Sequence, residues 1–233
     1  MTSITLVFVD ALFGEENVHI FEGVLSMPVL VTGGVVTAAG VVAGLRKINN
    51  DNLPKVAVMT AAFFTASFIH INVGPSTVHL MLNGLIGLMM GWVAFPIVLI
   101  GLLIQALLFQ YGGLTTLGIN TLNVAGPAVL FGYVFNKMIF SPVPFTSTVG
   151  AFGAGFCAIA LTAVMVFLAL ILTDPVKYKV SAYTILASHV PVMFIEGFVA
   201  LLCVRFLKKV KPELLRNPLG DNRRTAAPAP YQS

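Results

Sequence analysis

The sequence predicts an all-α integral membrane protein with about seven transmembrane helices in one bundle. Of its 233 residues, 58% are hydrophobic and only 9% are charged, whereas a soluble domain carries about a quarter charged residues. The apolar residues form long runs, close to the roughly 20 residues that a helix needs to cross a bilayer. Polar, glycine-containing and proline-containing segments separate these runs, a pattern typical of a multi-pass membrane protein.

Seven apolar segments follow one another along the chain. The stretch 76–110 is too long for one span, and Gly91 with Pro96 divides it into two helices. Residues 211–233 are polar and contain AAPAP, so they are expected to form a polar cytoplasmic tail. The seven predicted helices are 24–45, 55–72, 77–91, 93–110, 120–139, 147–173 and 180–207.

Lysine and arginine predict the orientation of the spans. Seven spans place the two ends of the chain on opposite sides of the membrane. With the C-terminus in the cytoplasm, 11 of the 13 basic residues lie inside, and only Lys177 and Lys179 lie outside. This distribution follows the positive-inside rule. The same orientation brings His19, His70 and His79 to the extracytoplasmic face, although each histidine taken singly is more often structural than ligating.

Several classes of function lack their sequence signals. The basic residues cluster at the ends of apolar segments, so no nucleic-acid partner is expected. No GxxxxGK[ST] loop is present, so any ATPase has to be a separate chain. No nucleophile–base constellation is present either, and the protein is not expected to be an enzyme. Cys157 and Cys203 lie inside apolar runs and are expected to be buried small hydrophobes.

Three stretches carry a resemblance to a known family: HIFEGVLS at 19–26, GPSTVHLMLNGLIG at 74–87, and QALLFQYGGLTTLGINTLNVAGPAVLFGY at 105–133. From about residue 18 to 215, the chain resembles the CbiM/NikM family, the substrate-capture membrane components of energy-coupling-factor transporters for cobalt and nickel. The resemblance implies that residues 18–210 form a transmembrane metal-binding component that takes up Co(II) or Ni(II), without choosing between them. Implied partners are a coupling transmembrane subunit, two ATPase subunits and often a small accessory membrane subunit.

The resemblance also implies a metal site. In the family, the metal is held by the terminal amine, by the backbone nitrogen and imidazole of the second residue, and by a histidine from a later loop. Carried over, these donors belong to Val18, His19 and His79. Four nitrogens in a square suit Ni(II) or Cu(II) and can be adapted to Co(II). Glu22 matches the family's acidic position, where it would orient His19. Further polar residues expected around the site are His70, Asn83, Asn120 and Asn123; Asn83 would follow His79 on the same helix face.

Val18 departs from the family, whose chains begin with Met-His. A GTG codon encodes valine internally but is read as methionine when it starts translation in bacteria. We therefore expect translation to begin at position 18 and residues 1–17 to be a mis-annotated N-terminal extension. Two alternatives stay open: cleavage between Asn17 and Val18 would expose an equivalent amine, or the extension is genuine and another ligand replaces the amine. The extension has no basic region and does not resemble a secretory signal.

Three other features carry weaker hypotheses. Glu196 is the one acid well inside a predicted span, which makes it a functional candidate by default; a neutral, hydrogen-bonded acid is the alternative reading. The stretch GGLTTLGIN is expected to form a structural lid over the metal site. In the first span, Ala39 with Ala43 and Gly40 with Gly44 repeat at four-residue spacing, which serves either packing within the bundle or docking onto the coupling subunit.

The alternative function is that of a self-sufficient secondary transporter or channel for divalent metal. Such a protein predicts several intramembrane acids, or a pair of interrupted helices in symmetric halves. The sequence contains one intramembrane acid and no obvious internal repeat. Those two observations favour the capture component.

Overall fold

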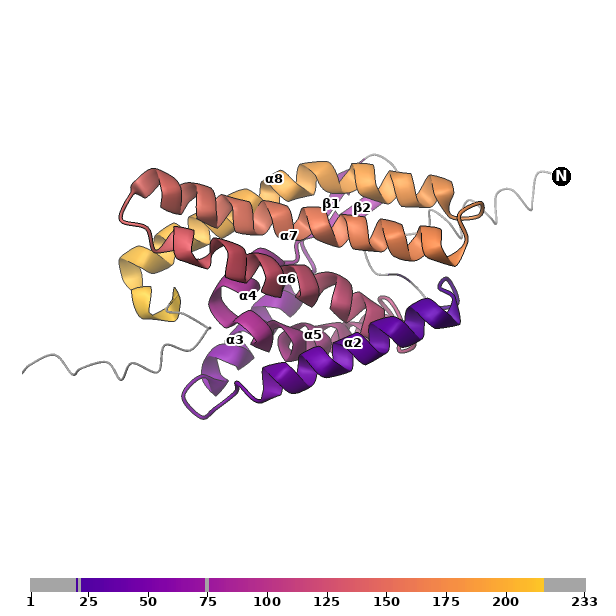
Figure 1. Cartoon of the computed structure of the whole chain (residues 1–233), viewed down its shortest axis with the longest axis horizontal. Coiled ribbons are helices and arrows are strands. Elements are labelled where there is room, and N and C mark those ends of the chain that lie inside the picture. Colours follow the sequence, from indigo (N-terminus) through magenta and orange to yellow (C-terminus); the bar gives the residue numbers. More distant parts are fainter. Residues whose placement is uncertain (1–19, 21, 74–75, 216–233) are drawn as a thin grey trace, which may run out of the picture.

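The computed structural model describes residues 20, 22–73 and 76–215, and the helices among them form one bundle (Figure 1). Its seven α-helices correspond one to one with the seven predicted segments, which confirms the predicted fold class. A two-stranded antiparallel hairpin and two short 3-10 helices complete the described elements. In chain order these are α2 (Met27–Leu45), α3 (Leu53–Ala66), β1 (His70–Val73), β2 (Ser76–His79), α4 (Asn83–Met90), η1 (Gly91–Val93), α5 (Ala94–Phe109), α6 (Leu117–Ile139), α7 (Pro144–Thr173), α8 (Lys179–Val210) and η2 (Pro212–Leu215).

Five helical segments among the described residues are long and apolar enough to cross a membrane. They are α2, α6, α7 and α8, together with the stretch Asn83–Phe109, which reaches this length only when α4 and α5 are counted together; α3 is a shorter apolar helix. Large apolar side chains such as Val35, Leu107 and Leu202 are exposed on the outside of the bundle, where a soluble protein would place polar groups. The chain is therefore a multi-pass membrane protein, and the predicted count of seven holds for helices rather than for full-length spans.

The hairpin corrects the predicted ends of two helices. Residues 67–72 and 77–82 were expected to be helical, but α3 ends at Ala66, α4 begins at Asn83, and the strands between them pair His70 with His79. Hydropathy alone does not separate a strand from a helix in a short apolar run. The β-branched residues of this stretch, among them Ile71, Val73 and Val78, favour the extended conformation.

The chain reverses direction between α4 and α5, as the predicted break at Gly91 required. Gly91 has φ 52° and ψ −126°, which ends α4. The strand β2 leads directly into α4, and the ring of Tyr111, just after α5, lies 6.2 Å from the ring of His70 in β1. Since α4 starts near the hairpin and α5 ends near it, the two helices run in opposite directions.

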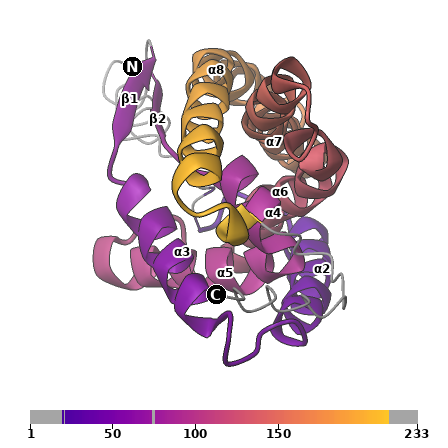
Figure 2. The ribbon, with the colours of Figure 1, turned by 90° about the vertical axis from the view of Figure 1, so that its left-hand side faces the viewer.

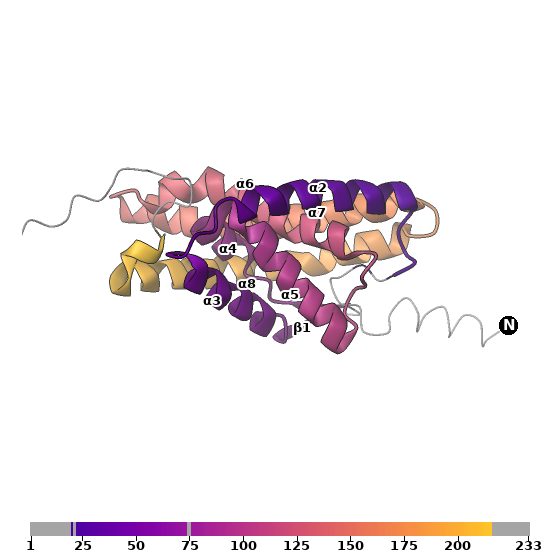
Figure 3. The ribbon, with the colours of Figure 1, turned by 90° about the horizontal axis from the view of Figure 1, so that it is seen from below.

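Helix α4 occupies the middle of the bundle. All eight of its residues are buried, and the view along the bundle shows it surrounded by the other helices (Figure 2). Glycine permits this position, because a Cβ on Gly87 would collide with the backbone of Ala128 in α6, and one on Gly84 with the backbone of Ala154 in α7. Around this centre, α2 packs along α6 and α3 packs along α5 (Figure 3).

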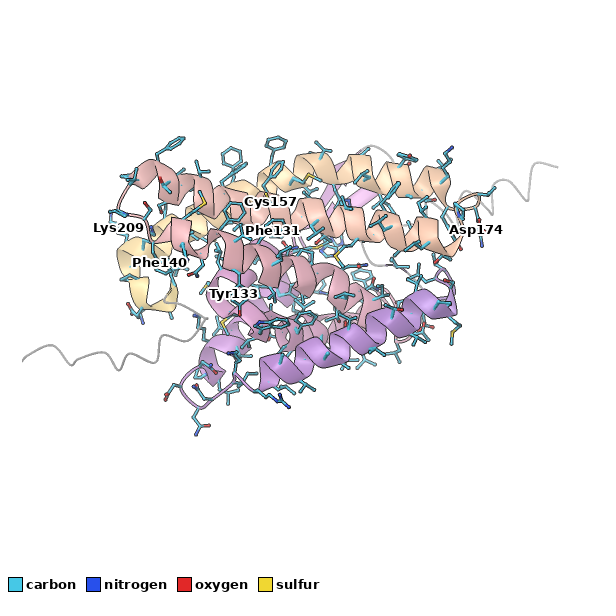
Figure 4. The ribbon with its side chains drawn as sticks, in the orientation of Figure 1. Phe131, Tyr133, Phe140, Cys157, Asp174 and Lys209 are labelled. Atoms are coloured by element: carbon cyan, nitrogen blue, oxygen red, sulfur yellow. The ribbon has the colours of Figure 1, made fainter. Side chains whose placement is uncertain are left out.

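The two ends of the bundle differ in charge. Figure 4 shows Lys209 at one end, with Phe140, and Asp174 at the other. We call the first the basic end, because eight of the ten lysines and arginines in the described ranges lie there; Lys177 and Lys179 lie at the opposite end. The residues of the basic end are Arg46, Lys47, Lys55, Lys137, Arg205, Lys208, Lys209 and Lys211.

Candidate functional site

Two histidines face each other at the base of the hairpin. The rings of His70 and His79 have their centroids 6.3 Å apart. His79 is 1% exposed, and its Nδ1 lies 3.2 Å from the carbonyl oxygen of Leu80. His70 is exposed, and its Nδ1 lies 3.0 Å from the carbonyl oxygen of Phe68. In the tautomer that donates from Nδ1, the lone pair of either ring is on Nε2, the form in which imidazole ligates metals.

His79 therefore belongs to a strand and not to the start of a helix. The expected shared helix face of His79 and Asn83 is wrong, because α4 begins only at Asn83, after a left-handed residue at Leu82. Instead, the hairpin places His70 directly opposite His79. His70 was expected at the end of a helical span.

Asn120 fixes the backbone of the N-terminal segment. Its Oδ1 accepts a hydrogen bond from the Ile20 N–H at 3.2 Å, and its Nδ2 donates to the Ile20 carbonyl oxygen at 3.1 Å. The Nδ2 group also lies 3.3 Å from Oγ1 of Thr116. Val18 and His19, the expected ligands that precede Ile20, lie outside the described residues. Ile20, which directly follows His19, is thus held by two hydrogen bonds from Asn120 at the start of α6.

The loop at residues 110–116 links the N-terminal segment to the hairpin. Glu22 accepts a hydrogen bond from the Thr115 N–H through Oε1 at 3.2 Å, and its side chain fills the space beside Gly113 that a Cβ would need. At the other side of the loop, the ring of Tyr111 contacts the ring of His70. The loop turns through left-handed residues at Gln110 and Gly112. Within the described residues, then, Glu22 contacts the glycine- and threonine-rich stretch.

Asn83 and Asn123 lie against α7. Asn83 donates to Oγ1 of Thr162 at 3.1 Å and accepts from the Gly84 N–H at 2.8 Å. The same Thr162 hydroxyl donates to the backbone carbonyl of Asn123 at 2.8 Å. The Asn123 amide group is buried and has no hydrogen-bond partner among the described residues. Both asparagines are thus linked to α7 through Thr162.

Glu196 has partners that the sequence did not reveal. Its Oε1 accepts hydrogen bonds from the backbone N–H groups of Met81 and Leu82, at the N-terminus of α4. Backbone donors carry no residue-type signal, so only the path of the chain shows them.

The described part of the chain does not complete a metal site by itself. Across residues 20, 22–73 and 76–215, no group of three or more histidine, cysteine, aspartate or glutamate side chains is arranged to hold a metal ion. The two imidazoles of the hairpin are the nitrogen donors that come together there.

Comparison with known proteins identifies relatives of the chain. A metal transport protein, so named, of Haemophilus influenzae is 35% identical over 198 residues, covering 84% of this chain and 96% of its own. A relative in Methanocorpusculum labreanum, named as a fused cobalt transport protein CbiMQ, is 28% identical over 220 residues, covering 84% of this chain and 36% of its own. The crystal structure of a truncated transition metal transporter has the same fold, with a TM-score of 0.66 at 23% identity, covering 82% of this chain and 98% of its own.

The family model that matches is described as the cobalt uptake substrate-specific transmembrane region, and it matches residues 19–214. That range takes in the hairpin, the glycine- and threonine-rich loop, Asn120 and Glu196. The chain therefore belongs to the CbiM family.

Proposed function

We propose that this protein captures Co(II) or Ni(II) at the end of the bundle opposite the basic end. The observation that carries the proposal is the convergence of two segments there. Asn120 holds the backbone of Ile20 next to His19, and the loop 110–116 contacts Glu22 on one side and His70 of the hairpin on the other. Imidazole, amine and amide nitrogen are suitable donors for either ion, so both substrates stay open.

The proposed ligands are the amine of residue 18, the backbone nitrogen and imidazole of His19, and the imidazole of His79. Asn120 and Glu22 would support them by holding the N-terminal segment, and the exposed ring of His70 stands next to the fourth ligand. Asn83 and Asn123 would act more remotely, through their contacts with α7. This ligand set requires a free amino group on residue 18.

We further propose that the protein is the capture component of an ATP-driven transporter of the energy-coupling-factor type, which would supply metal for processes such as cobalamin biosynthesis. Its partners would be a coupling transmembrane subunit, two ATPase subunits and a small accessory membrane subunit. The fused relative supports a membrane partner, because this chain matches only 36% of it. The basic end, with the C-terminus, would face the cytoplasm according to the positive-inside rule.

A self-sufficient secondary transporter is the second candidate, and one observation favours it. Helix α4 begins inside the bundle after non-helical backbone, next to the buried acid Glu196; interrupted helices of this kind line the substrate sites of secondary transporters. Proteoliposomes that contain this chain alone separate the two candidates. Metal uptake without any ATPase would favour the secondary transporter, and uptake only with the ATPase and coupling subunits would favour the capture component.

Metal binding by purified variants tests the site. Equilibrium dialysis of the protein in detergent, produced with residue 18 as its first residue, against Ni(II) or Co(II) should show one high-affinity site per chain. His79→Ala should lower the affinity at least about tenfold, because a ligand is lost. His189→Ala is the matched control: His189 is also buried, but on α8, where its Nδ1 contacts the Ile185 carbonyl oxygen. Equal affinities of His79→Ala and the unmodified protein would refute the proposed site.

A further inference from the structure

We propose that Glu196 is a positioning residue that holds His79 in place for the metal. The inference rests on the proposed function, in which His79 is a ligand. Three residues separate His79 from the first turn of α4, and Glu196 binds the backbone of the last two of them, Met81 and Leu82. The acid acts on the connecting segment, and through it on the imidazole.

The connecting segment is tied down at each of its residues. The Leu80 N–H donates to the Ile69 carbonyl oxygen at 3.1 Å, which closes the base of the hairpin. The His79 ring contacts the Leu80 carbonyl oxygen through Nδ1. The Met81 and Leu82 N–H groups both donate to Oε1 of Glu196, the second at 2.9 Å. Glu196 is therefore the group that ties this segment to α8.

The Leu82 N–H, at the N-cap of α4, belongs to the set that a helix N-terminus leaves without an intrahelical partner, and the Met81 N–H directly precedes it. In the middle of a membrane bundle water does not take that role, so a protein group has to accept them. Met81 is fully buried, and Glu196 is 1% exposed. Leu82 also has φ 53°, a left-handed conformation that non-glycine residues seldom adopt. The carboxyl oxygen holds the backbone in this conformation.

The opposite end of α4 is anchored as well. The Lys55 ammonium donates to the Met89 carbonyl oxygen at 3.1 Å and to the Leu214 carbonyl oxygen at 2.5 Å. Between the two ends, Gly84 and Gly87 let α4 lie directly against the backbones of α7 and α6. Helix α4 is therefore held at both ends and along its length. Glu196 of α8 binds the backbone at its N-terminus, directly after the segment that carries His79.

Three variants of the protein in detergent, each with residue 18 as its first residue, test the proposal, with Co(II) as the probe. Glu196→Gln keeps a side-chain oxygen that accepts both N–H groups, so its affinity should stay within about threefold of the unmodified protein. Glu196→Leu has no acceptor, and its Co(II) affinity should fall about 10-fold to 100-fold, the usual effect of losing a group that orients a ligand. Ser188→Ala is the control, because Ser188 is also a buried residue of α8, and its hydroxyl donates within its own helix to the Ile185 carbonyl oxygen.

The Co(II) absorption spectrum distinguishes positioning from a merely structural role. A displaced His79 should change the ligand-field bands of the bound ion in Glu196→Leu and leave them unchanged in Ser188→Ala. A Glu196→Leu protein with lower thermal stability but unchanged affinity and spectrum would overturn the inference. So would a large loss of affinity in Glu196→Gln, because the carboxylate would then act on the ion itself. If His79→Ala also binds normally, the proposed function fails instead.

Hydrogen exchange on the unmodified protein needs no substitution and covers the case in which Glu196→Leu does not fold. Loading with Co(II) should slow amide exchange in residues 79–86 several-fold and leave the α8 segment around Ser188 unchanged. Equal exchange in residues 79–86 with and without the metal would contradict the coupling between His79 and the turn.

Discussion

Asn120 makes the hydrogen bonds that a neighbouring strand would otherwise make to Ile20. Its side-chain amide accepts from the Ile20 N–H and donates to the Ile20 carbonyl oxygen, so both polar groups of one backbone unit are satisfied by one residue. Both bonds are buried, and leaving either backbone group without a partner would cost about 1–3 kcal/mol. The position of the chain next to His19 therefore depends on Asn120.

Asn120→Ala should accordingly lower the affinity for Ni(II) or Co(II) about 10-fold or more, because the N-terminal ligands lose their support. Equilibrium dialysis measures the effect. Thr121→Ala is the control, since Thr121 is the next residue of α6, is also buried, and bonds only to the Leu117 carbonyl oxygen of its own helix. Equal affinities for Asn120→Ala and Thr121→Ala would show that the Ile20 backbone does not govern binding.

At the scale of residues, the sequence pointed to Glu22, His70, His79 and Asn120, and in the structure the rings of His70 and His79 face each other across the hairpin. The sequence could not give their partners. Glu196 and Asn120 both bind backbone groups, and a backbone N–H looks the same at every position of a sequence. Asn83 was expected near His79 on helical spacing, and that expectation failed because the residues between them are not helical.

At the scale of elements, α4 depends on glycine for its place. A Cβ on Gly87 would overlap the Ala128 backbone of α6, whereas one on Gly34 of α2 meets no atom within 4 Å. Both glycines are helical, so both substitutions to alanine gain the same intrinsic helix propensity, roughly 0.5–1 kcal/mol. Packing alone distinguishes them.

Gly87→Ala should therefore destabilise the protein by about 1–3 kcal/mol through overpacking, and Gly34→Ala should leave the stability unchanged or slightly higher. Thermal unfolding in detergent, followed by circular dichroism, measures both. If Gly87→Ala melts at the same temperature as Gly34→Ala, α6 and α4 are able to separate, and the close approach is not a requirement of the fold.

The long helices were predictable from hydropathy, and the hairpin with its half-length helix was not. The segments 147–173 and 180–207 became α7 (Pro144–Thr173) and α8 (Lys179–Val210) with shifts of a few residues at their ends. Apolar residues such as Ile69, Ile71 and Val78 extend the apolar runs into the stretch from Ser67 to Leu82, so hydropathy assigned 67–72 and 77–82 to helices. Its extended path is a tertiary property, because α8 and α4 supply the surroundings that satisfy the backbone there.

At the scale of the whole molecule, the fold class followed from composition, because so few charges cannot cover a water-soluble surface. The gathering of basic residues at one end of the bundle was also predicted from the sequence, by the positions of lysine and arginine along the chain. Basic residues distant in sequence, such as Arg46 in the turn after α2 and Arg205 in α8, gather at one end of the bundle (Figure 1). Hydrogen bonds from Arg205 to Thr148 and from Lys208 to Ser147 tie this end together.

Labelling from the two sides of the membrane tests which end faces the cytoplasm. In a background with Cys157→Ser and Cys203→Ser, cysteine is introduced in place of Val176, between α7 and α8, or in place of Lys209; both positions are exposed. By the positive-inside rule, Val176→Cys should react with a membrane-impermeant maleimide on intact cells, and Lys209→Cys only after permeabilisation. The reverse pattern would place the hairpin histidines and Ile20 on the cytoplasmic side. Capture of metal from outside the cell would then be excluded, whatever the affinity of the site.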